Sequence, residues 1–253
     1  RDVAPSRGLG DVYKRQGRQS PVKVSWHDVR TFEGLCEAVT RNTECTASEF
    51  AEACARVLPA NGFDKPAEWP AAFLPDSYEV YWTAPASGIV EKLVGYRNEW
   101  WNAERVARAH ALGLTPVEVA TVASIVEEET AKADERGKVA RLYINRLRKG
   151  MRLQADPTVK FASRRFDLRR IAGDVLKTDS PYNTYMVQGL PPGPIRVASK
   201  SAIEAVLDAP EHDYIYMCAK SDFSGYHDFA VDYATHQANA RRYQAELNKR
   251  NIH

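Results

Sequence analysis

The chain has 253 residues, of which 44% are apolar, so it can bury one large hydrophobic core or two smaller ones. Its 35 lysines and arginines nearly balance its 33 aspartates and glutamates, which gives no electrostatic reason to expect binding to nucleic acid or to an acidic membrane surface. The sequence contains no run of about 18 apolar residues, so we expect no membrane-spanning helix within it.

The cysteines also exclude some classes of site. Cys36, Cys45, Cys54 and Cys218 form no C-x-x-C pair, and no histidine stands at zinc-ligand spacing from them. We therefore expect neither a metal site nor another cofactor. Cys36 and Cys54 fall in helical patterns, where free buried thiols are a simpler interpretation than a disulfide.

The first third of the chain predicts a tail and a small module. Residues 1–16 lack periodicity and resemble an adapter-derived peptide, so we expect a non-native or disordered tail there. Val22 to Trp26 alternates as a strand does. Thr31 and Thr46 are expected to cap two short helices, the second as part of a capping box.

A proline-containing loop follows these helices, and we place a domain boundary in it. The boundary divides an N-terminal subdomain, residues 17–72, from a catalytic domain, residues 73–253. The catalytic domain is expected to begin with one long helix over residues 87–112, which ends at Gly113.

Helices and then strands are predicted in the rest of the chain. Thr115, Pro116 and Glu118 supply a complete start signal for a helix, and a further helix is expected at residues 135–149. Residues 151–161 are expected to be strand and loop. Near the end, we expect a hairpin of Asp213–Ala219 with Tyr226–Ala230 and a closing helix at residues 231–248. The predicted fold class is α+β.

The helix from Thr115 to Thr130 is apolar, yet it ends in three consecutive glutamates. At about 100° per residue, Glu128 and Glu129 fall on the polar face of this helix, where water would solvate them. Glu127 falls about 80° from Val119, beside small apolar residues. This position would desolvate the Glu127 carboxylate, raise its pKa and suit it to general acid catalysis.

The periodicity leaves an alternative open for Glu127. A buried carboxylate often pairs with a buried arginine, and the following helix offers Arg141 and Arg146. In that case Glu127 would hold two helices together.

Four motifs in order along the chain resemble a known family. They are A-S-I-V-E-E-E-T at residues 123–130, I-N-R-L-R-K-G-M-R-L-Q-A-D-P-T-V at 144–159, S-P-Y-N-T-Y at 180–185 and G-L-P-P-G-P-I at 189–195. Their order and spacing are similar to those of the MltG (YceG-like) endolytic murein transglycosylases. The resemblance extends from about residue 17 to the end. It implies a catalytic domain of helices packed on a small sheet, preceded by a partial LysM-like subdomain.

The resemblance also implies an activity. The family cleaves the MurNAc–GlcNAc β-1,4 bond within peptidoglycan glycan strands and leaves 1,6-anhydro-MurNAc ends. Its catalytic glutamate, the first of the S-I-V-E motif, corresponds to Glu127, which would act first as an acid and then as a base. Many members have lysine at the next position, where this chain has Glu128.

Five further residues match family motifs and are of the kinds that orient sugars. Gln154 and Asp156 lie in L-Q-A-D-P-T, and Tyr182, Asn183 and Tyr185 lie in S-P-Y-N-T-Y. We expect them to bind substrate. The alternative for each is that it stabilises a loop by turn formation or packing.

The expected partners are peptidoglycan glycan strands and the synthases that extend them. The resemblance implies a location at the periplasmic face of the bacterial inner membrane, through an N-terminal anchor that this chain lacks. Three other functions stay open: a peptidoglycan-binding scaffold without catalysis, a hydrolytic muramidase that also uses Asp156, and a DNA-binding helix-turn-helix at L-G-L-T-P-V-E-V-A. The balanced charge disfavours the last.

Overall fold

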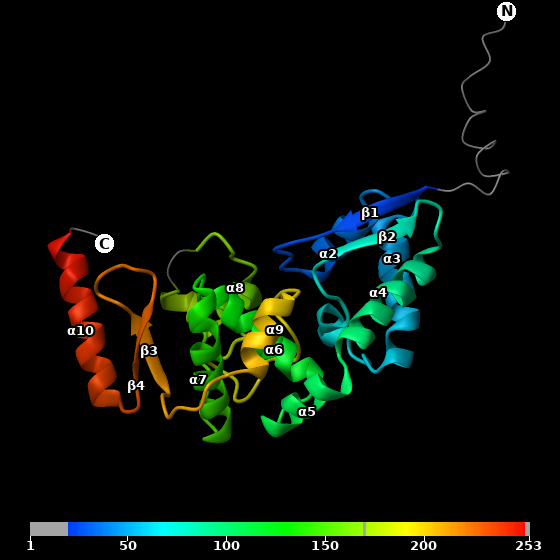
Figure 1. The fold of residues 1–253 in the computed structure, drawn as a ribbon. Helices are drawn as coiled ribbons and strands as arrows, with labels where there is room; N and C mark the ends of the chain where they lie inside the picture. The colour runs from blue at the N-terminus through cyan, green and yellow to red at the C-terminus, as the bar shows by residue number, and fades with distance from the viewer. Residues whose placement is uncertain (1–19, 169–170, 251–253) are drawn as a thin grey trace, which may run out of the picture.

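The computed structural model describes residues 20–168 and 171–250 and shows, within them, a mixed helical fold with two small antiparallel sheets (Figure 1). The predicted α+β class is thereby confirmed. The elements are β1 (Pro21–Ser25), α2 (Phe32–Thr40), α3 (Ala47–Val57), η1 (Pro59–Asn61), η2 (Pro66–Ala72), β2 (Ser77–Tyr81), α4 (Ala86–Trp100), α5 (Ala103–Ala111), α6 (Pro116–Glu129), η3 (Ala133–Glu135), α7 (Arg136–Arg148), α8 (Asp156–Ser163), η4 (Gly173–Lys177), α9 (Lys200–Leu207), β3 (Tyr216–Ala219), β4 (His227–Ala230) and α10 (Tyr233–Lys249). The tail predicted at residues 1–16 lies outside the described residues.

The first hydrophobic core belongs to the N-terminal part of the chain. Strand β1 pairs antiparallel with β2, and α2, α3 and α4 complete this unit (Figure 1). Trp26 stacks on Tyr78 with 5.2 Å between ring centroids. The N-caps predicted at Thr31 and Thr46 are confirmed, and Glu49 closes the capping box on Thr46.

The predicted boundary at residues 72–73 does not coincide with the division between the cores. Tyr78 and Val80 of β2, together with one face of α4, are buried in the first core. The helix predicted over residues 87–112 is in fact two helices, because the chain leaves helical geometry at Trp101. Asn102 then accepts a hydrogen bond from the backbone N–H of Arg105 and caps α5, as asparagine favours.

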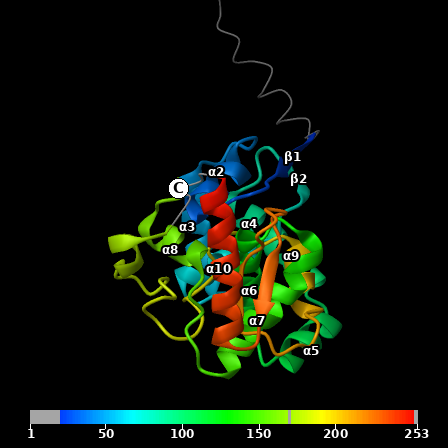
Figure 2. The ribbon, with the colours of Figure 1, turned by 90° about the vertical axis from the view of Figure 1, so that its left-hand side faces the viewer.

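The second core surrounds α6. Every residue of this helix from Val119 to Val126 is buried, and α5, α7, α8 and α9 pack around it (Figures 1 and 2). The capping box of Thr115 and Glu118 is confirmed. A helix buried on all sides cannot enter a DNA groove, which argues against the helix-turn-helix alternative. Within the described residues no single helix is long and apolar enough to cross a membrane, although α5 and α6, bent by 73° at their junction, together meet the length and composition test.

The segment after α7 differs from its prediction. Residues 151–161 were expected to be strand and loop, yet α8 begins at Asp156. Pro157 is the second residue of this helix, in the first turn, where a backbone N–H would have no partner within the helix. The C-terminal prediction is confirmed: β3 and β4 form an antiparallel hairpin, and α10 packs along it (Figure 2).

One glycine brings the two cores together. The loop that carries G-L-P-P-G-P-I lies against η2, and a Cβ added to Gly193 would stand 1.8 Å from the carbonyl oxygen of Ala67. Only glycine permits this approach. The same loop is joined to α6, because the backbone N–H of Ile195 donates to Ser124 Oγ at 3.0 Å.

Candidate active site

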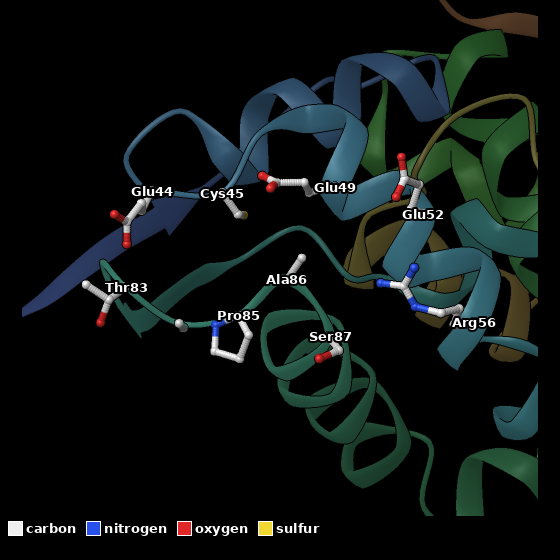
Figure 3. A pocket seen from close by; sticks show the side chains of 10 residues that line it. Glu44, Cys45, Glu49, Glu52, Arg56, Thr83, Pro85, Ala86 and Ser87 are labelled. Atoms are coloured by element: carbon white, nitrogen blue, oxygen red, sulfur yellow. The ribbon is translucent and has the colours of Figure 1, made fainter.

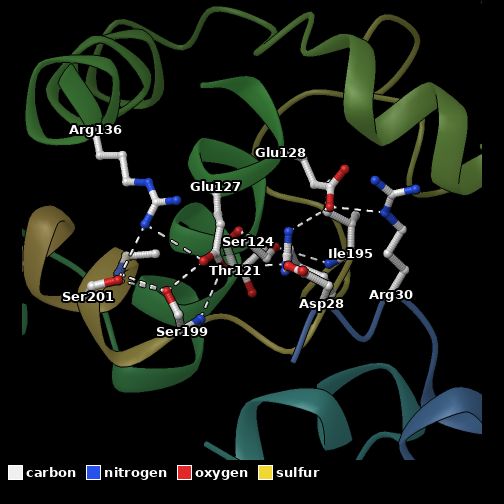
Figure 4. A network of polar contacts seen from close by, with 12 residues as sticks. Asp28, Arg30, Thr121, Ser124, Glu127, Glu128, Arg136, Ile195, Ser199 and Ser201 are labelled. Carbon is white, nitrogen blue, oxygen red and sulfur yellow. Dashed lines mark hydrogen bonds and ion pairs between the residues drawn. The ribbon is translucent and has the colours of Figure 1, made fainter. Parts of the chain in front are cut away.

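The glutamate predicted to be catalytic lies in a network of polar contacts at the start of α9 (Figure 4). Glu127 Oε2 accepts a hydrogen bond from the backbone N–H of Ser199 at 3.0 Å, and Oε1 accepts one from the Ser199 hydroxyl at 2.6 Å. Arg136 Nη1 lies 3.7 Å from Oε1, and Arg196 Nε lies 3.4 Å from Oε2. Only 9% of the Glu127 side chain is exposed. The carboxylate is thus occupied by partners within the protein.

These contacts correct the surroundings that the sequence predicted for Glu127. We expected small apolar neighbours with room for a ligand, and the structure shows a serine and two arginines. The alternative of an arginine partner is closer to what is found, although the partners differ. Arg141 donates instead to the carbonyls of residues 209 and 210, and Arg146 to those of residues 153 and 215.

The second glutamate connects the two cores. Glu128 Oε1 accepts hydrogen bonds from Arg196 Nη1 at 2.8 Å and from Arg30 Nε at 3.1 Å (Figure 4). Arg196 also donates through Nη2 to Asp28 Oδ1 at 2.7 Å. Arg30 and Asp28 belong to the N-terminal unit, so one buried guanidinium joins this unit to the end of α6.

The third glutamate faces a cavity. A cavity of about 220 Å³ lies between the end of α6, α7, the start of α8 and the β3–β4 hairpin. The polar side chains in its lining include Glu129, Tyr143, Arg146, Gln154, Asp156, Tyr185 and His227. Two residues along a helix correspond to a rotation of about 200°, so Glu129 points away from the network of Glu127.

The position of Glu129 contradicts its predicted solvation. Its Oε2 atom is buried and has no hydrogen-bond partner among the described residues. The pKa of Glu129 is raised to about 7, chiefly by burial and also by the negative charge of Asp156. The Tyr143 hydroxyl, Lys160 and Arg146 act in the opposite direction and lower this pKa. A large fraction of this carboxyl is therefore protonated at neutral pH.

Three predicted substrate-binding residues lie in the same cavity. Tyr185 Oη donates a hydrogen bond to Asp156 Oδ1 at 2.7 Å. Burial and Asp156 raise the pKa of Tyr185, so its hydroxyl stays a donor. Gln154 has a backbone φ of +51°, which is uncommon for a residue other than glycine and is typical of strained functional sites. The alternative role of Asp156 in a turn is not found, since it is the first residue of α8.

The other two predicted residues lie outside the cavity lining. Asn183 is fully buried, and its Nδ2 donates to the carbonyls of Leu176 and Thr178. Its Oδ1 accepts from the backbone N–H of Tyr185, so Asn183 fixes the loop that presents Tyr185. The ring of Tyr182 packs against Phe161 at 4.7 Å. Both residues thus have the loop-stabilising contacts of the alternative.

The sequence argument missed Glu129, Arg146 and His227. A helical wheel with one core side cannot find Glu129, because α6 is buried on every face. A signal was present in the run of eight apolar or small residues from Val119 to Val126, which indicates burial all round.

A second cavity, of about 400 Å³, lies in the N-terminal unit between α3 and the start of α4 (Figure 3). Glu49 and Glu52 line it, but the Glu49 carboxylate is held in the capping box of α3. No trio of histidine, cysteine or carboxylate side chains within residues 20–168 and 171–250 could hold a metal ion.

The fold and the first cavity define a mixed helical protein with a polar cavity, lined by a carboxyl group of raised pKa, at the end of a buried helix. The YceG-like family model matches residues 8–242, so the chain belongs to the YceG-like family. The match begins inside the stretch predicted as a tail. The family resemblance inferred from the motifs is confirmed.

Two curated relatives are similar to part of the chain. The endolytic murein transglycosylase of Bacillus subtilis (strain 168) is 47% identical over 102 residues, which cover 40% of this chain and 28% of that protein. The protein of the same name from Streptococcus pneumoniae serotype 2 (strain D39 / NCTC 7466) is 37% identical over 110 residues, which cover 42% of this chain and 20% of that protein. The matched part thus spans less than a third of either relative.

A solved structure matches the fold. The 2.6 Å crystal structure of a putative YceG-like protein from Listeria monocytogenes aligns with a TM-score of 0.70 and 22% sequence identity. The alignment covers 93% of this chain and 82% of that one. It supports the arrangement of the elements.

Proposed function

We propose that the chain is an endolytic lytic transglycosylase, which cleaves the MurNAc–GlcNAc β-1,4 bond of peptidoglycan glycan strands with Glu129 as its general acid. The observation that carries this proposal is the carboxyl group of Glu129 in the cavity, with a pKa of about 7. A general acid works best when its pKa lies near the working pH. The relatives named as murein transglycosylases support the choice of substrate.

The simplest mechanism uses one carboxyl group twice. Protonated Glu129 gives its proton to the glycosidic oxygen as the bond from that oxygen to the anomeric carbon breaks. The C6 hydroxyl of the same MurNAc then attacks the anomeric carbon, and the Glu129 carboxylate accepts its proton. The product is a 1,6-anhydro-MurNAc end, and Glu129 is protonated again.

The neighbours of Glu129 have roles that their contacts support. Gln154 offers hydrogen-bond donors to sugar hydroxyl and acetamido groups, and the Tyr185 oxygen, whose hydrogen goes to Asp156, can accept from a sugar hydroxyl. Asp156 keeps the pKa of Glu129 raised through its negative charge. In this proposal Glu127 holds the start of α9 in place and does not touch substrate, and its catalytic role stays a prediction from the motif.

The test compares three variants on purified peptidoglycan sacculi. We expect Glu129→Gln to lower the release of anhydro-muropeptides by about 10²–10⁴-fold, because loss of a general acid has that effect. Glu127→Gln and Glu128→Gln serve as matched controls on the same helix, and their folded fractions should keep most of the activity. Full activity in Glu129→Gln with loss in Glu127→Gln would restore the assignment made from the motif.

One observation favours a second candidate. Asp156 lies in the same cavity as Glu129, and paired carboxylates are the machinery of hydrolytic glycosidases. A muramidase would use Asp156 to activate water or to trap the sugar. Mass spectrometry of the products decides between them, since hydrolysis leaves a reducing MurNAc end and transglycosylation leaves the anhydro form.

The remaining expectations rest on the family resemblance. We propose that the native protein works at the periplasmic face of the inner membrane, beside the peptidoglycan synthases. The LysM-like nature of the N-terminal unit also stays a prediction. If wild type and Glu129→Gln bind glycan strands equally and neither cleaves them, the function is that of a scaffold.

A further inference from the structure

A histidine in the lining of the same cavity has the contacts of a positioned base. His227 is the first residue of β4 and lines the same cavity as Glu129. Its side chain is 16% exposed. The transglycosylase scheme above does not use it.

A buried carboxylate holds one side of this imidazole ring. His227 Nδ1 lies 2.8 Å from Glu135 Oε2, and the backbone N–H of His227 donates to Glu135 Oε1 at 2.8 Å. The hydroxyl of Thr130 also donates to Oε2, at 3.2 Å. Only 6% of Glu135 is exposed, so these three contacts fix both the carboxylate and the ring.

The contacts determine which ring nitrogen carries hydrogen. Glu135 accepts from a backbone N–H and from a hydroxyl, and the remaining contact is satisfied when Nδ1–H donates to it. In the neutral ring, Nε2 then keeps its lone pair. Nε2 has no hydrogen-bond partner among the described residues, so it is available to a ligand in the cavity.

Thr130 places this pair next to the proposed acid. It directly follows Glu129 in the chain and ends α6. Its hydroxyl reaches Glu135, while its own backbone N–H donates to Val126 at 3.1 Å. The end of α6 therefore fixes both Glu129 and, through Glu135, the ring of His227.

We propose that His227 is a catalytic base, which takes the proton from the sugar hydroxyl that attacks the anomeric carbon, and that Glu135 is its positioning residue. A hydroxyl nucleophile, a histidine base and a carboxylate that orients the histidine form a common arrangement for activating a weak nucleophile. The inference rests on the proposed function. It leaves the role of general acid to Glu129 and gives the role of general base to His227.

The proton balance of this step is complete. Glu129 gives its proton to the leaving glycosidic oxygen, and the bond from that oxygen to the anomeric carbon breaks. The attacking hydroxyl oxygen bonds to the same carbon, and its proton moves to His227 Nε2. Glu129 is then ionised and His227 is protonated, and exchange with water restores both.

The other candidate bases fit less well. Asp156 already accepts a hydrogen bond from the Tyr185 hydroxyl, so its Oδ1 atom is occupied. Glu129 can accept the proton only after it has lost its own, so its two roles must follow one another. His227 can accept a proton while Glu129 donates one, so bond breaking and bond formation can overlap.

The experiment uses the full chain with peptidoglycan sacculi and compares His227→Ala, Glu135→Gln and Glu129→Gln. We expect His227→Ala to lower kcat by about 10²-fold or more with KM changed by less than about threefold, and Glu135→Gln to lower kcat by about tenfold. Added imidazole should restore part of the activity of His227→Ala and none of that of Glu129→Gln. His110→Ala, at an exposed position on α5, is the matched control and should keep wild-type activity.

A second measurement does not depend on activity. Nitrogen NMR of histidine-labelled wild type should show the Nδ1–H tautomer for His227, and Glu135→Gln should weaken that preference. The inference is wrong if His227 carries its hydrogen on Nε2. It is also wrong if His227→Ala cleaves at the wild-type rate, or if it loses activity that imidazole does not restore. Loss in Glu129→Gln alone would leave the proposed function standing without this inference, whereas wild-type activity in Glu129→Gln would overturn the proposed function itself.

Discussion

Replacing Glu129 by glutamine should make the protein more stable at alkaline pH. The pKa of Glu129 is raised from 4.5 to about 7, chiefly because burial disfavours the charged form. A raised carboxyl pKa contributes stability that is fully present below the unfolded pKa and is lost as pH rises through the folded pKa. Stability therefore falls between about pH 4.5 and pH 7, where Glu129 is ionised in the unfolded chain and still protonated in the folded protein.

The size of this effect follows from the shift. Each pKa unit corresponds to about 1.4 kcal/mol, so a shift from 4.5 to about 7 corresponds to about 3 kcal/mol. Glutamine does not titrate. The free energy of unfolding of Glu129→Gln, relative to wild type, should therefore rise by about 3 kcal/mol between pH 4 and pH 8.

Urea denaturation of both proteins at a series of pH values measures this difference. Glu127→Gln is a control expected to have the opposite effect, because it removes the carboxylate that faces Arg136 and one of the three carboxylates that face Arg196. We expect it to lower the free energy of unfolding by about 1–3 kcal/mol near neutral pH. If the free energy of unfolding of Glu129→Gln, relative to wild type, does not change with pH, the buried environment that the structure assigns to Glu129 is refuted.

Three other perturbations test the site and its support. Asp156→Asn removes a charge that raises the pKa of Glu129, so the fall of cleavage activity above about pH 7 should move to lower pH. A profile of cleavage rate against pH measures this shift, and a fall at the same or a higher pH would contradict it. Arg196→Met removes the buried guanidinium that faces both Glu127 and Glu128 and should lower the free energy of unfolding by about 3–5 kcal/mol. Asp28→Asn, at the exposed partner of Arg196, should change it by less than about 1 kcal/mol, and equal effects in urea denaturation would show that the network is not buried. Gly193→Ala has no room for its Cβ and should lower the melting temperature by at least about 5 °C, and an unchanged melting temperature would contradict the close approach to η2.

Much of the fold could be predicted because its signals are local. The capping boxes at Thr46 and Thr115 and the C-terminal hairpin depend on a few neighbouring residues, and the structure has them where they were expected. The break at Asn102 was missed because a strong N-cap residue lay inside a continuous helical pattern. The helix at Asp156 was missed because proline was interpreted as a loop signal although it also suits the first turn of a helix.

The candidate site was harder to predict than the fold. A wheel sorts residues into two faces, but the surroundings of α6 come from segments distant in sequence. Ser199 and Arg196 satisfy Glu127, and Asp156 with the hairpin encloses Glu129. No pattern within residues 115–130 contains that information. The motifs point to this segment of the chain, and the tertiary contacts distinguish among its three glutamates.

The end of α6 has a consequence for how this protein tolerates change. Three successive carboxylates point to α9, to the N-terminal unit and to the cavity, and each has its own set of partners. One residue inserted between Val119 and Glu127 would turn all three by about 100°, leaving buried arginines unpaired and removing the carboxyl group from the cavity. In a library of variants, single-residue insertions and deletions in this segment should therefore be eliminated even where many substitutions at the same positions survive.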